Sequence, residues 1–503
     1  MVKTPPRPVL NLKSCSVDID QAVQHFVRKQ SGPPQKALSH IFKTNAKVAA
    51  RMDIRKLVDS SPMGLRQWSI IFIALYLNAL DGYDMVAMAF GAGQVTEAFT
   101  LSDVQLGWLL SAALIGIGLG SLFLAPTADR VGRTRLITIS LFIDLVGLVA
   151  TVFAPTFALL FIFRVLTGIG VGGVLVCVTV LVSEYSNLRF RGLAVAIYAS
   201  GYGLGASLCG VIASAVAPSY GWQAIFWVGA GLTVVAIALT VLFVPESADF
   251  LAARGRMDKV RFIAAKLGLK GEVTVRATKD EEPRAPFKDI LSPSFVRTTI
   301  KLWLAFSFVM FAYNFTSQWT PKLLTEEGLT AQQGVIGGIM LSFGGTIGAL
   351  IFGFLTTKID ARPLLIVSCL VASGVLVGFI FSTSIPTLMF SLGVGVGLTL
   401  NACITGLYTV APESYPSALR TTGTGAAIGI ARVGATLAPI LTGYLLSSGW
   451  TPTGLYTLAG ATALLAALSL FGVRAYSAKI ADEAPASTPA DAALSDAPLT
   501  SRV

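Results

Sequence analysis

Twelve apolar segments make up most of this sequence, and each is close to the ~20 residues that an α-helix needs to cross the hydrocarbon core of a bilayer. Helices can cross membranes because their backbone polar groups are satisfied within the segment. Charged residues make up only 13% of the chain, whereas soluble domains contain about 25%. We therefore predict an all-α polytopic membrane protein. The twelve predicted helices are residues 68–93, 106–128, 135–154, 157–183, 191–216, 223–245, 298–321, 333–356, 363–382, 385–410, 421–446 and 452–474.

The distribution of lysine and arginine predicts the orientation of these helices. The net charge is +11, and nearly all basic residues lie in the terminal segments and in alternate loops. The other loops contain Lys322 and mostly acids, such as Glu97 and Glu326. Because the number of helices is even, the positive-inside rule places both termini in the cytoplasm. This distribution argues against a nucleic-acid partner, because proteins that bind nucleic acids place their positive charge on one folded basic face. The basic loops are 129–135, 184–191, 246–301, 357–362 and 411–420.

A long polar segment divides the chain into two halves. Residues 246–297 are predicted to form a cytoplasmic linker between two six-helix bundles, 68–245 and 298–474. The linker sequence "RGRMDKVRFIAAKLGLKGE" predicts a short amphipathic helix at the membrane surface.

Both ends of the chain are polar. We expect residues 1–67 to form a cytoplasmic extension and residues 475–503 to form a disordered cytoplasmic tail. Met52 begins a compact polar lead into the first helix. Residues 1–51 are therefore interpreted as a dispensable extension, or as the result of an upstream mis-assigned start.

The two halves share a charge pattern. Glu184 precedes Arg191 by seven residues, and Glu413 precedes Arg420 by the same interval. Both residues recur after 229 positions, from 184 to 413 and from 191 to 420. At nearly the same shift, "APTADRVGR" aligns with "GFLTTKIDA". Two parallel six-helix repeats are typical of secondary transporters with a substrate site between the halves, near the middle of the membrane.

The polar residues form none of the usual catalytic patterns. The sequence contains no nucleophile–base pair, metal-ligand cluster or phosphate-binding loop, and glycine runs such as "GIGVGG" lie inside apolar helices, where they predict close helix packing. The five cysteines contain no CxxC pair, which gives no support to a disulfide framework or a zinc site. We predict no enzymatic activity, no cofactor and no metal. A membrane-bound enzyme and a transporter-like sensor are the alternatives from other functional classes.

Charged residues inside the predicted helices are the strongest functional signal. Asp81 and Asp84 lie in "LDGYD" within the first helix, where each acid costs roughly 2.5–3.5 kcal/mol. Their i, i+3 spacing places both on one face, which we expect to point toward a polar interior. Arg164 and Arg432 are intramembrane cations that could serve that interior. Asp144 is a further buried acid, to which the sequence assigns no role.

Several of these motifs resemble those of one transporter superfamily. "LAPTADRVGRTR" resembles the GxxxDRxGR loop signature of the major facilitator superfamily, with Ala125 in place of the usual glycine, and "VPESADF" resembles its PES-type motif. "LDGYD" resembles the DGxD signature of the aromatic acid:proton symporters, which include 4-hydroxybenzoate and benzoate transporters. The resemblance covers most of residues 52–474. It implies the major facilitator fold in a bacterial inner membrane, and we expect a monomeric transport unit.

The resemblance also implies a gate on the cytoplasmic side. In the loop signature, a carboxylate at a helix end can accept hydrogen bonds from an arginine or from the N-terminus of another helix. The alternative is a solvated turn whose basic residues only set the topology. The predicted gating residues are Asp129, Arg130, Gly132, Arg133, Glu184, Arg191, Glu413 and Arg420.

An aromatic acid needs a cation for its carboxylate and rings for its flat body. In the symporter family, the two acids of DGxD are required for proton-coupled uptake, which implies that role for Asp81 and Asp84, and we predict Arg164 as their switching partner. Ordinary helix packing is the alternative for each aromatic residue, and Trp319 could instead be an interfacial anchor. The candidate substrate contacts are Arg164, Tyr313, Asn314, Phe315, Gln318, Trp319, Asn401, Tyr408 and Arg432.

These observations predict a proton-coupled secondary active transporter that imports an aromatic carboxylate, such as a hydroxybenzoate, by alternating access. Its partners would be the aromatic acid, protons and the lipid bilayer. The alternatives among transporters are uptake of a sugar, a nicotinate-like acid, a non-aromatic carboxylate or an organic cation, and proton-driven drug export.

Overall fold

The computed structural model describes residues 51–267, 272–274, 287–473 and 476. This part of the chain contains twelve helices that are long and apolar enough to cross a membrane, so the predicted all-α polytopic fold is confirmed. The largest difference from the predicted boundaries is in the first helix, which extends to Phe99. The twelve spans are α4 (Leu65–Phe99), α5 with its continuation (Asp103–Val131), α7 (Arg133–Val152), α8 (Phe157–Tyr185), α9 (Arg191–Tyr220), α10 (Gln223–Phe243), α13 (Val296–Glu326), α14 (Ala331–Leu355), α15 (Ala361–Phe381), α16 (Pro386–Glu413), α17 (Ser417–Ser447) and α18 (Pro452–Leu470).

The second span changes its winding near its end. The α-helix α5 (Asp103–Leu119) continues as the π-helical turn η1 (Gly120–Leu124), the 3₁₀ turn η2 (Ala125–Thr127) and the short helix α6 (Ala128–Val131). Ala125, which replaces the glycine of the loop signature, is buried in this turn.

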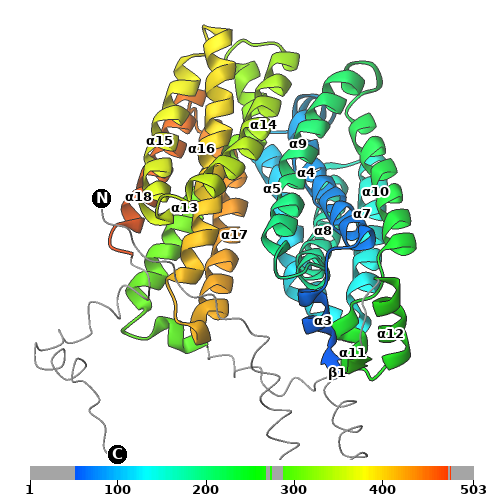
Figure 1. Ribbon diagram of the computed structural model, residues 1–503. Helices are drawn as coiled ribbons and strands as arrows, with labels where there is room; N and C mark the ends of the chain where they lie inside the picture. The colour runs from blue at the N-terminus through cyan, green and yellow to red at the C-terminus, as the bar shows by residue number, and fades with distance from the viewer. Residues whose placement is uncertain (1–50, 268–271, 275–286, 474–475, 477–503) are drawn as a thin grey trace, which may run out of the picture.

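The membrane-spanning helices of each half form a separate bundle (Figure 1). The same packing pairs occur in both halves: α4 packs on α9 as α13 packs on α17, and α7 packs on α8 as α15 packs on α16. Likewise, α5 packs on α8 as α14 packs on α16. This correspondence between helices in the same order is what a parallel six-helix repeat requires.

Glycines bring the first and fifth helices of the N-terminal half together. A Cβ atom added to Gly82 of α4 would overlap the backbone carbonyl of Tyr202 on α9. In the reverse direction, a Cβ atom on Gly205 of α9 would overlap the carbonyl of Ala79 on α4. Such backbone contact explains why small residues occupy this interface, and it fixes the helix that contains Asp81 and Asp84.

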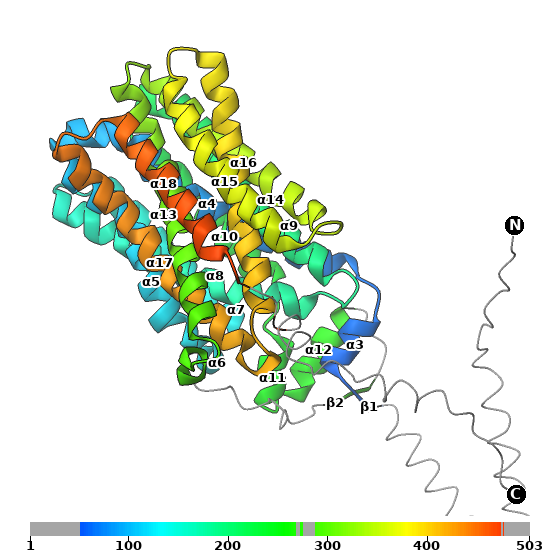
Figure 2. The same cartoon turned by 90° about the vertical axis from the view of Figure 1, so that its left-hand side faces the viewer.

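We call the side of the bundle where α3 (Ile54–Ser60), α11 (Ala248–Ala253) and α12 (Met257–Lys266) lie the linker side. These short helices group together beyond one end of the long helices (Figure 2). The remaining short elements of the described chain are the parallel strand pair β1 (Arg51–Asp53) and β2 (Glu272–Thr274) and the 3₁₀ turn η3 (Phe287–Leu291).

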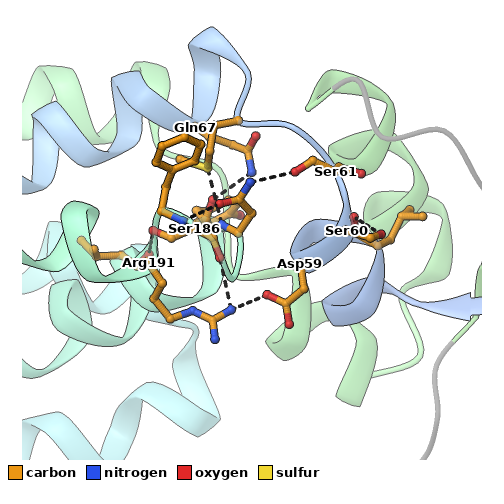
Figure 3. A network of polar contacts seen from close by, with 12 residues as sticks. Asp59, Ser60, Ser61, Gln67, Ser186 and Arg191 are labelled. Atoms are coloured by element: carbon orange, nitrogen blue, oxygen red, sulfur yellow. Dashed lines mark hydrogen bonds and ion pairs between the residues drawn. The ribbon is translucent and has the colours of Figure 1, made fainter. Parts of the chain in front are cut away.

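Helix α3 is anchored to the N-terminal half, with Leu57 and Val58 buried in its core. An ion pair joins Asp59 to Arg191 at the start of α9, and Asn187 donates a hydrogen bond of 2.9 Å from Nδ2 to the carbonyl of Ser61 (Figure 3). The predicted extension 1–67 therefore includes a helix, α3, whose Leu57 and Val58 are packed against the N-terminal half. Residues 1–50, 474–475 and 477–503 lie outside the described residues, so the predictions for 1–51 and for the tail stay predictions.

The two halves meet through polar contacts on the side opposite the linker and near the middle of the helices. Lys322 forms an ion pair with Asp103, and Gln318 Nε2 donates to the carbonyl of Met85 at 3.1 Å. Ser111 Oγ donates to the carbonyl of Thr436 at 2.9 Å. Toward the linker side, the ribbons of the two halves diverge (Figure 1).

Candidate functional site

A cavity of about 360 Å³ lies between the two halves. Helices from both bundles line it, including α4 and α9 from one half and α13, α16 and α17 from the other. This places the cavity where a pair of six-helix repeats predicts a substrate site. Six of the predicted site residues line it: Asp81, Tyr313, Asn314, Asn401, Tyr408 and Arg432.

Sequence reasoning missed several polar residues of the cavity wall. Asn78 precedes Asp81 by one helical turn, and Tyr198 and Tyr202 lie one turn apart on α9. Tyr313 of the other half lies within hydrogen-bonding reach of Tyr202. The signal was the regular spacing of these polar side chains within apolar helices, which marks the face of a helix that avoids lipid.

Three aromatic or amide candidates do not line the cavity. Trp319 is fully buried (0% exposed), and its indole N–H donates to the carbonyl of Pro439 at 3.3 Å. It is therefore neither a cavity residue nor an interfacial anchor, because its polar end is satisfied inside the protein. Phe315 packs edge to face on Tyr456 with ring centroids 5.0 Å apart, and Gln318 bridges the two halves as described above.

Arg164 and Asp84 lie together inside the N-terminal half rather than at the cavity wall. Arg164 is 1% exposed and Asp84 is 2% exposed. The guanidinium Nη2 of Arg164 donates to the backbone carbonyl of Asp84 at 2.8 Å, and the centre of the guanidinium lies 5.2 Å from the ring centroid of Phe226. Neither carboxyl oxygen of Asp84 has a hydrogen-bond partner among the described residues. The arginine is therefore placed as a neighbour of the acid but, in this conformation, is bonded to its backbone.

The structure gives Asp144 a definite place beside these residues. It is 1% exposed, and Thr233 of α10 donates to its Oδ2 at 3.2 Å. A second, small cavity of about 10 Å³ is lined by Asp81, Asp84 and Asp144, which is the volume that about one water molecule needs. Asp81 borders this small cavity as well as the large one, so it lies between the substrate-sized space and the two deeper acids.

The charges of this site are unevenly divided. Asp81, Asp84 and Asp144 lie in the N-terminal half with one cation, Arg164, whereas Arg432 of the C-terminal half acts on Asp81 from across the large cavity. Burying charges is costly unless they are paired. Three ionised acids beside one arginine would leave excess negative charge in a buried site.

On the linker side, the loop signature and the PES-type motif form one network. Arg133 forms an ion pair with Glu184 and donates to Ser247 Oγ at 3.2 Å. Ser247 in turn donates to Glu184 Oε2 at 2.7 Å. These three residues join the ends of α7 and α8 to the start of α11.

Glu246 accepts hydrogen bonds at the beginning of α7. Its Oε1 is 3.0 Å from the backbone nitrogen of Thr134 and 3.0 Å from that of Ser247. Gly132 has a φ of 110°, and a Cβ atom there would lie 2.5 Å from Glu246 Oε2. The carboxylate that caps a helix N-terminus in this loop is therefore Glu246, whereas the predicted latch residues Asp129 and Arg130 are exposed on α6.

The seven-residue spacing that revealed the repeat does not mark an ion pair. Glu184 pairs with Arg133, and Arg191 pairs with Asp59, because Arg191 begins a new helix that faces α3. The corresponding residues in the other half are Glu413 and Arg362. Arg362 lies close enough to Glu413 for the two charges to attract each other. Both members are displaced by 229 residues, from 184 to 413 and from 133 to 362. Arg420 is exposed near the start of α17.

Comparison with known proteins agrees with this arrangement. The sequence profile of the Major Facilitator Superfamily matches residues 71–427 and, in a second match, 339–501. The gallate transporter of Pseudomonas putida is 29% identical over 434 residues, which are 84% of this chain and 95% of that protein. The 4-hydroxybenzoate transporter PcaK of Acinetobacter baylyi is 30% identical over 431 residues, 84% of this chain and 94% of the relative.

Solved structures show the same fold. The crystal structure of a D-xylose–proton symporter superposes with a TM-score of 0.67 at 18% identity, covering 81% of this chain and 97% of the symporter. A bacterial homologue of the lysosomal transporter Spinster gives a TM-score of 0.63 and covers 81% of this chain and 95% of its own. The chain is thus a transporter rather than an enzyme, and it belongs to the major facilitator superfamily, in the family of the 4-hydroxybenzoate and gallate transporters.

Proposed function

We propose that this protein imports an aromatic carboxylate together with protons, by alternating access of the cavity between its two halves. The observation that carries the proposal is the position of Asp81, which borders both the large cavity and the small cavity shared with Asp84 and Asp144. A solute in the large cavity would therefore lie next to the group through which protons enter the acid cluster. The names of the relatives, which are gallate and 4-hydroxybenzoate transporters, support the class of solute.

The large cavity has the chemistry that an aromatic anion needs. Its volume of about 360 Å³ lies at the small end of the range for ligand pockets, about 300–1,000 Å³. Arg432 supplies a cation for the carboxylate, and Tyr202, Tyr313 and Tyr408 supply ring faces. The amides of Asn314 and Asn401 are suited to ring hydroxyl groups. Arg432, rather than Arg164, is then the carboxylate ligand.

Proton coupling follows from the charges of the site. A membrane potential of 100 mV, negative inside, opposes entry of a monoanion by about 2.3 kcal/mol, and one accompanying proton cancels that cost. Burial favours the neutral form of a carboxylic acid, and a nearby arginine favours the charged form. We propose that helix movement exchanges the contacts of Arg164 between the carbonyl and the carboxyl group of Asp84, which alternates proton uptake and release. Asp144 shares the proton through the small cavity.

We infer that this conformation is open toward the linker side, because the contacts between the halves lie away from it. The contacts Lys322–Asp103, Gln318–Met85 and Ser111–Thr436 join the halves away from that side. Opening the opposite side would break these three contacts. The linker side would then close, and the Arg133–Glu184 and Arg362–Glu413 regions would lie at the closed gate. We infer from the charge distribution that the linker side is cytoplasmic and that both termini lie in the cytoplasm. Membership of the superfamily supports the further proposal of a monomeric transport unit in a bacterial inner membrane.

The proposal is tested by uptake of radiolabelled 4-hydroxybenzoate, gallate, benzoate and nicotinate into cells that express the full chain. Glucose and an organic cation serve as non-aromatic controls. We expect accumulation of at least one aromatic acid, and its abolition by a protonophore. Accumulation of glucose or the cation alone would contradict the solute class, and accumulation unaffected by the protonophore would contradict the coupling.

A further inference from the structure

A large basic pocket lies at the linker-side end of the N-terminal half, separate from the transport cavity. It encloses about 680 Å³ between the ends of α4, α7 and α10 and the short helices α11 and α12. None of the residues that line it also lines the cavity between the halves. Six of its lining residues are exposed cations: Arg66, Arg135, Arg254, Arg256, Lys259 and Lys266.

The wall beside these cations is apolar and faces outward. Leu242 and Phe243, in the last turn of the membrane-spanning helix α10, are 73% and 59% exposed. Phe262 on α12 is 60% exposed, whereas Val260 and Ile263 on the same helix are buried against the bundle. The pocket thus joins a cluster of positive charge to a surface that continues along a membrane helix.

Some of the cations are already held in position. Arg254 lies 4.8 Å from the ring centroid of Phe250, and Lys266 lies 4.6 Å from that of Phe262. Arg66 donates from Nη1 to the carbonyl of Lys266 at 2.5 Å. These contacts place charged groups around the pocket without neutralising them, because rings and carbonyls carry no net charge.

One acid, Glu246, also lines the pocket. Its Oε1 is occupied by two backbone N–H groups, and its Oε2 faces Gly132. The pocket has six cations and one carboxylate, which already accepts two hydrogen bonds. The pocket is therefore strongly positive, and the ligand that suits it is an anion.

We propose that this pocket binds the phosphate headgroup of an anionic phospholipid from the adjacent membrane leaflet. The phosphate would lie among the arginines and lysines, and an acyl chain would lie along Leu242, Phe243 and Phe262. Basic pockets beside membrane helices are suited to such headgroups, and arginine forms two-pronged contacts with phosphate. The apolar wall favours a lipid over a soluble phosphate, which would gain nothing from it. This site is independent of the solute that crosses the membrane.

The test uses the purified full chain and native mass spectrometry with phosphatidylglycerol or phosphatidylcholine added. The pocket variant carries Arg135→Gln, Arg256→Gln and Lys259→Gln. The matched control carries Arg189→Gln, Lys288→Gln and Arg297→Gln, which remove the same charge at exposed positions outside the pocket. We expect phosphatidylglycerol to bind the wild type about tenfold or more tightly than phosphatidylcholine, and the pocket variant to lose most of that preference while the control keeps it. Equal losses in the two triple variants would overturn the proposal, because only net charge would matter.

A second arm separates a lipid from a free phosphate. Leu242→Ser, which leaves all six cations and the ring contacts of Arg254 and Lys266 in place, should weaken phosphatidylglycerol binding and leave any binding of glycerol 3-phosphate unchanged. If the triple variant fails to fold, this single variant still tests whether the pocket binds a lipid. Glycerol 3-phosphate or inorganic phosphate binding as tightly as phosphatidylglycerol would contradict a lipid site.

Discussion

Arg164 donates a hydrogen bond to the backbone carbonyl of Asp84, 2.8 Å away, and leaves the carboxyl group of the same residue without a hydrogen-bond partner among the described residues. Both side chains are almost completely buried. A buried cation beside a buried acid normally pairs with it, since each is costly to bury alone. The observed contact leaves the carboxyl group of Asp84 available for the proton exchange that we propose, in which helix movement brings Arg164 to that carboxyl group.

Replacement of Asp84 by asparagine should separate transport from its energy source. Asp84→Asn keeps the shape of the side chain but cannot exchange a proton. A pH difference of one unit supplies about 1.4 kcal/mol, or about tenfold accumulation, per coupled proton. We expect the variant to lose this accumulation in vesicles while it still exchanges labelled for unlabelled substrate. Asp258→Asn, on the exposed face of α12, is the control and should behave like the wild type; unchanged pH-driven accumulation in Asp84→Asn would refute the assignment.

Asp144 should influence coupling rather than substrate affinity. Asp144→Asn removes one carboxyl group from the small cavity, so we expect weaker pH-driven uptake with a KM within about twofold of the wild type, because Asp144 does not line the substrate cavity. Thr233→Val removes only the hydroxyl group that donates to Asp144 and should shift the pH profile of uptake by less. A purely structural role for Asp144 predicts loss of folded protein in both variants and an unaltered pH profile in what remains.

Arg432 should determine the affinity for the carboxylate. A hydrogen bond to a charged group contributes about 1.5–3 kcal/mol, so Arg432→Gln should raise the Kd by about ten- to a hundredfold. Arg432→Lys keeps the charge but not the planar, two-pronged donor, and should be intermediate. Equilibrium binding of labelled 4-hydroxybenzoate to detergent-solubilised protein measures this directly, with Arg297→Gln as the control outside the cavity. A Kd that stays the same in Arg432→Gln would mean that another group binds the carboxylate.

Gly132 should be intolerant of any side chain. Its φ of 110° and the proximity of Glu246 both act against Gly132→Ala, and a strained backbone conformation alone costs about 1–3 kcal/mol. We expect a lower thermal midpoint and slower transport. Gly93→Ala is the matched control, because a Cβ atom at Gly93 meets nothing within 4 Å and alanine favours a helix. Equal midpoints for the two variants would argue against a strained loop.

Most of the fold followed from the sequence because membrane helices must satisfy their own backbone and present apolar side chains to lipid. All twelve helices, the two repeats and the fold class were predictable for that reason. The contacts between charged residues were harder to predict from the sequence. Spacing along the chain related Glu184 to Arg191, but the structure pairs Glu184 with Arg133 and Arg191 with Asp59. Ion pairs form between side chains at helix ends that meet in space, which the spacing along the chain does not give.

The candidate site was predicted in part for a similar reason. Asp81, Tyr313, Asn401 and Arg432 stand out because polar groups are rare in apolar helices, and they line the cavity. Trp319 carries the same kind of signal and yet is enclosed in the C-terminal half, because the direction in which a helix faces depends on its neighbours. Asp144 could be recognised as unusual from the sequence, but its place next to Asp81 and Asp84 at the small cavity depends on how the helices pack.

Coupled movement of protons and an aromatic acid is the central claim, and proton flux in reconstituted vesicles tests it most directly. Vesicles that contain the purified protein and a trapped pH indicator are mixed with 4-hydroxybenzoate, or with the aromatic acid that cells accumulate, at equal pH on both sides. The account predicts that the interior acidifies faster than in protein-free vesicles, and that Asp84→Asn loses this excess. Substrate entry without excess acidification, measured with radiolabel in the same vesicles, would contradict proton coupling.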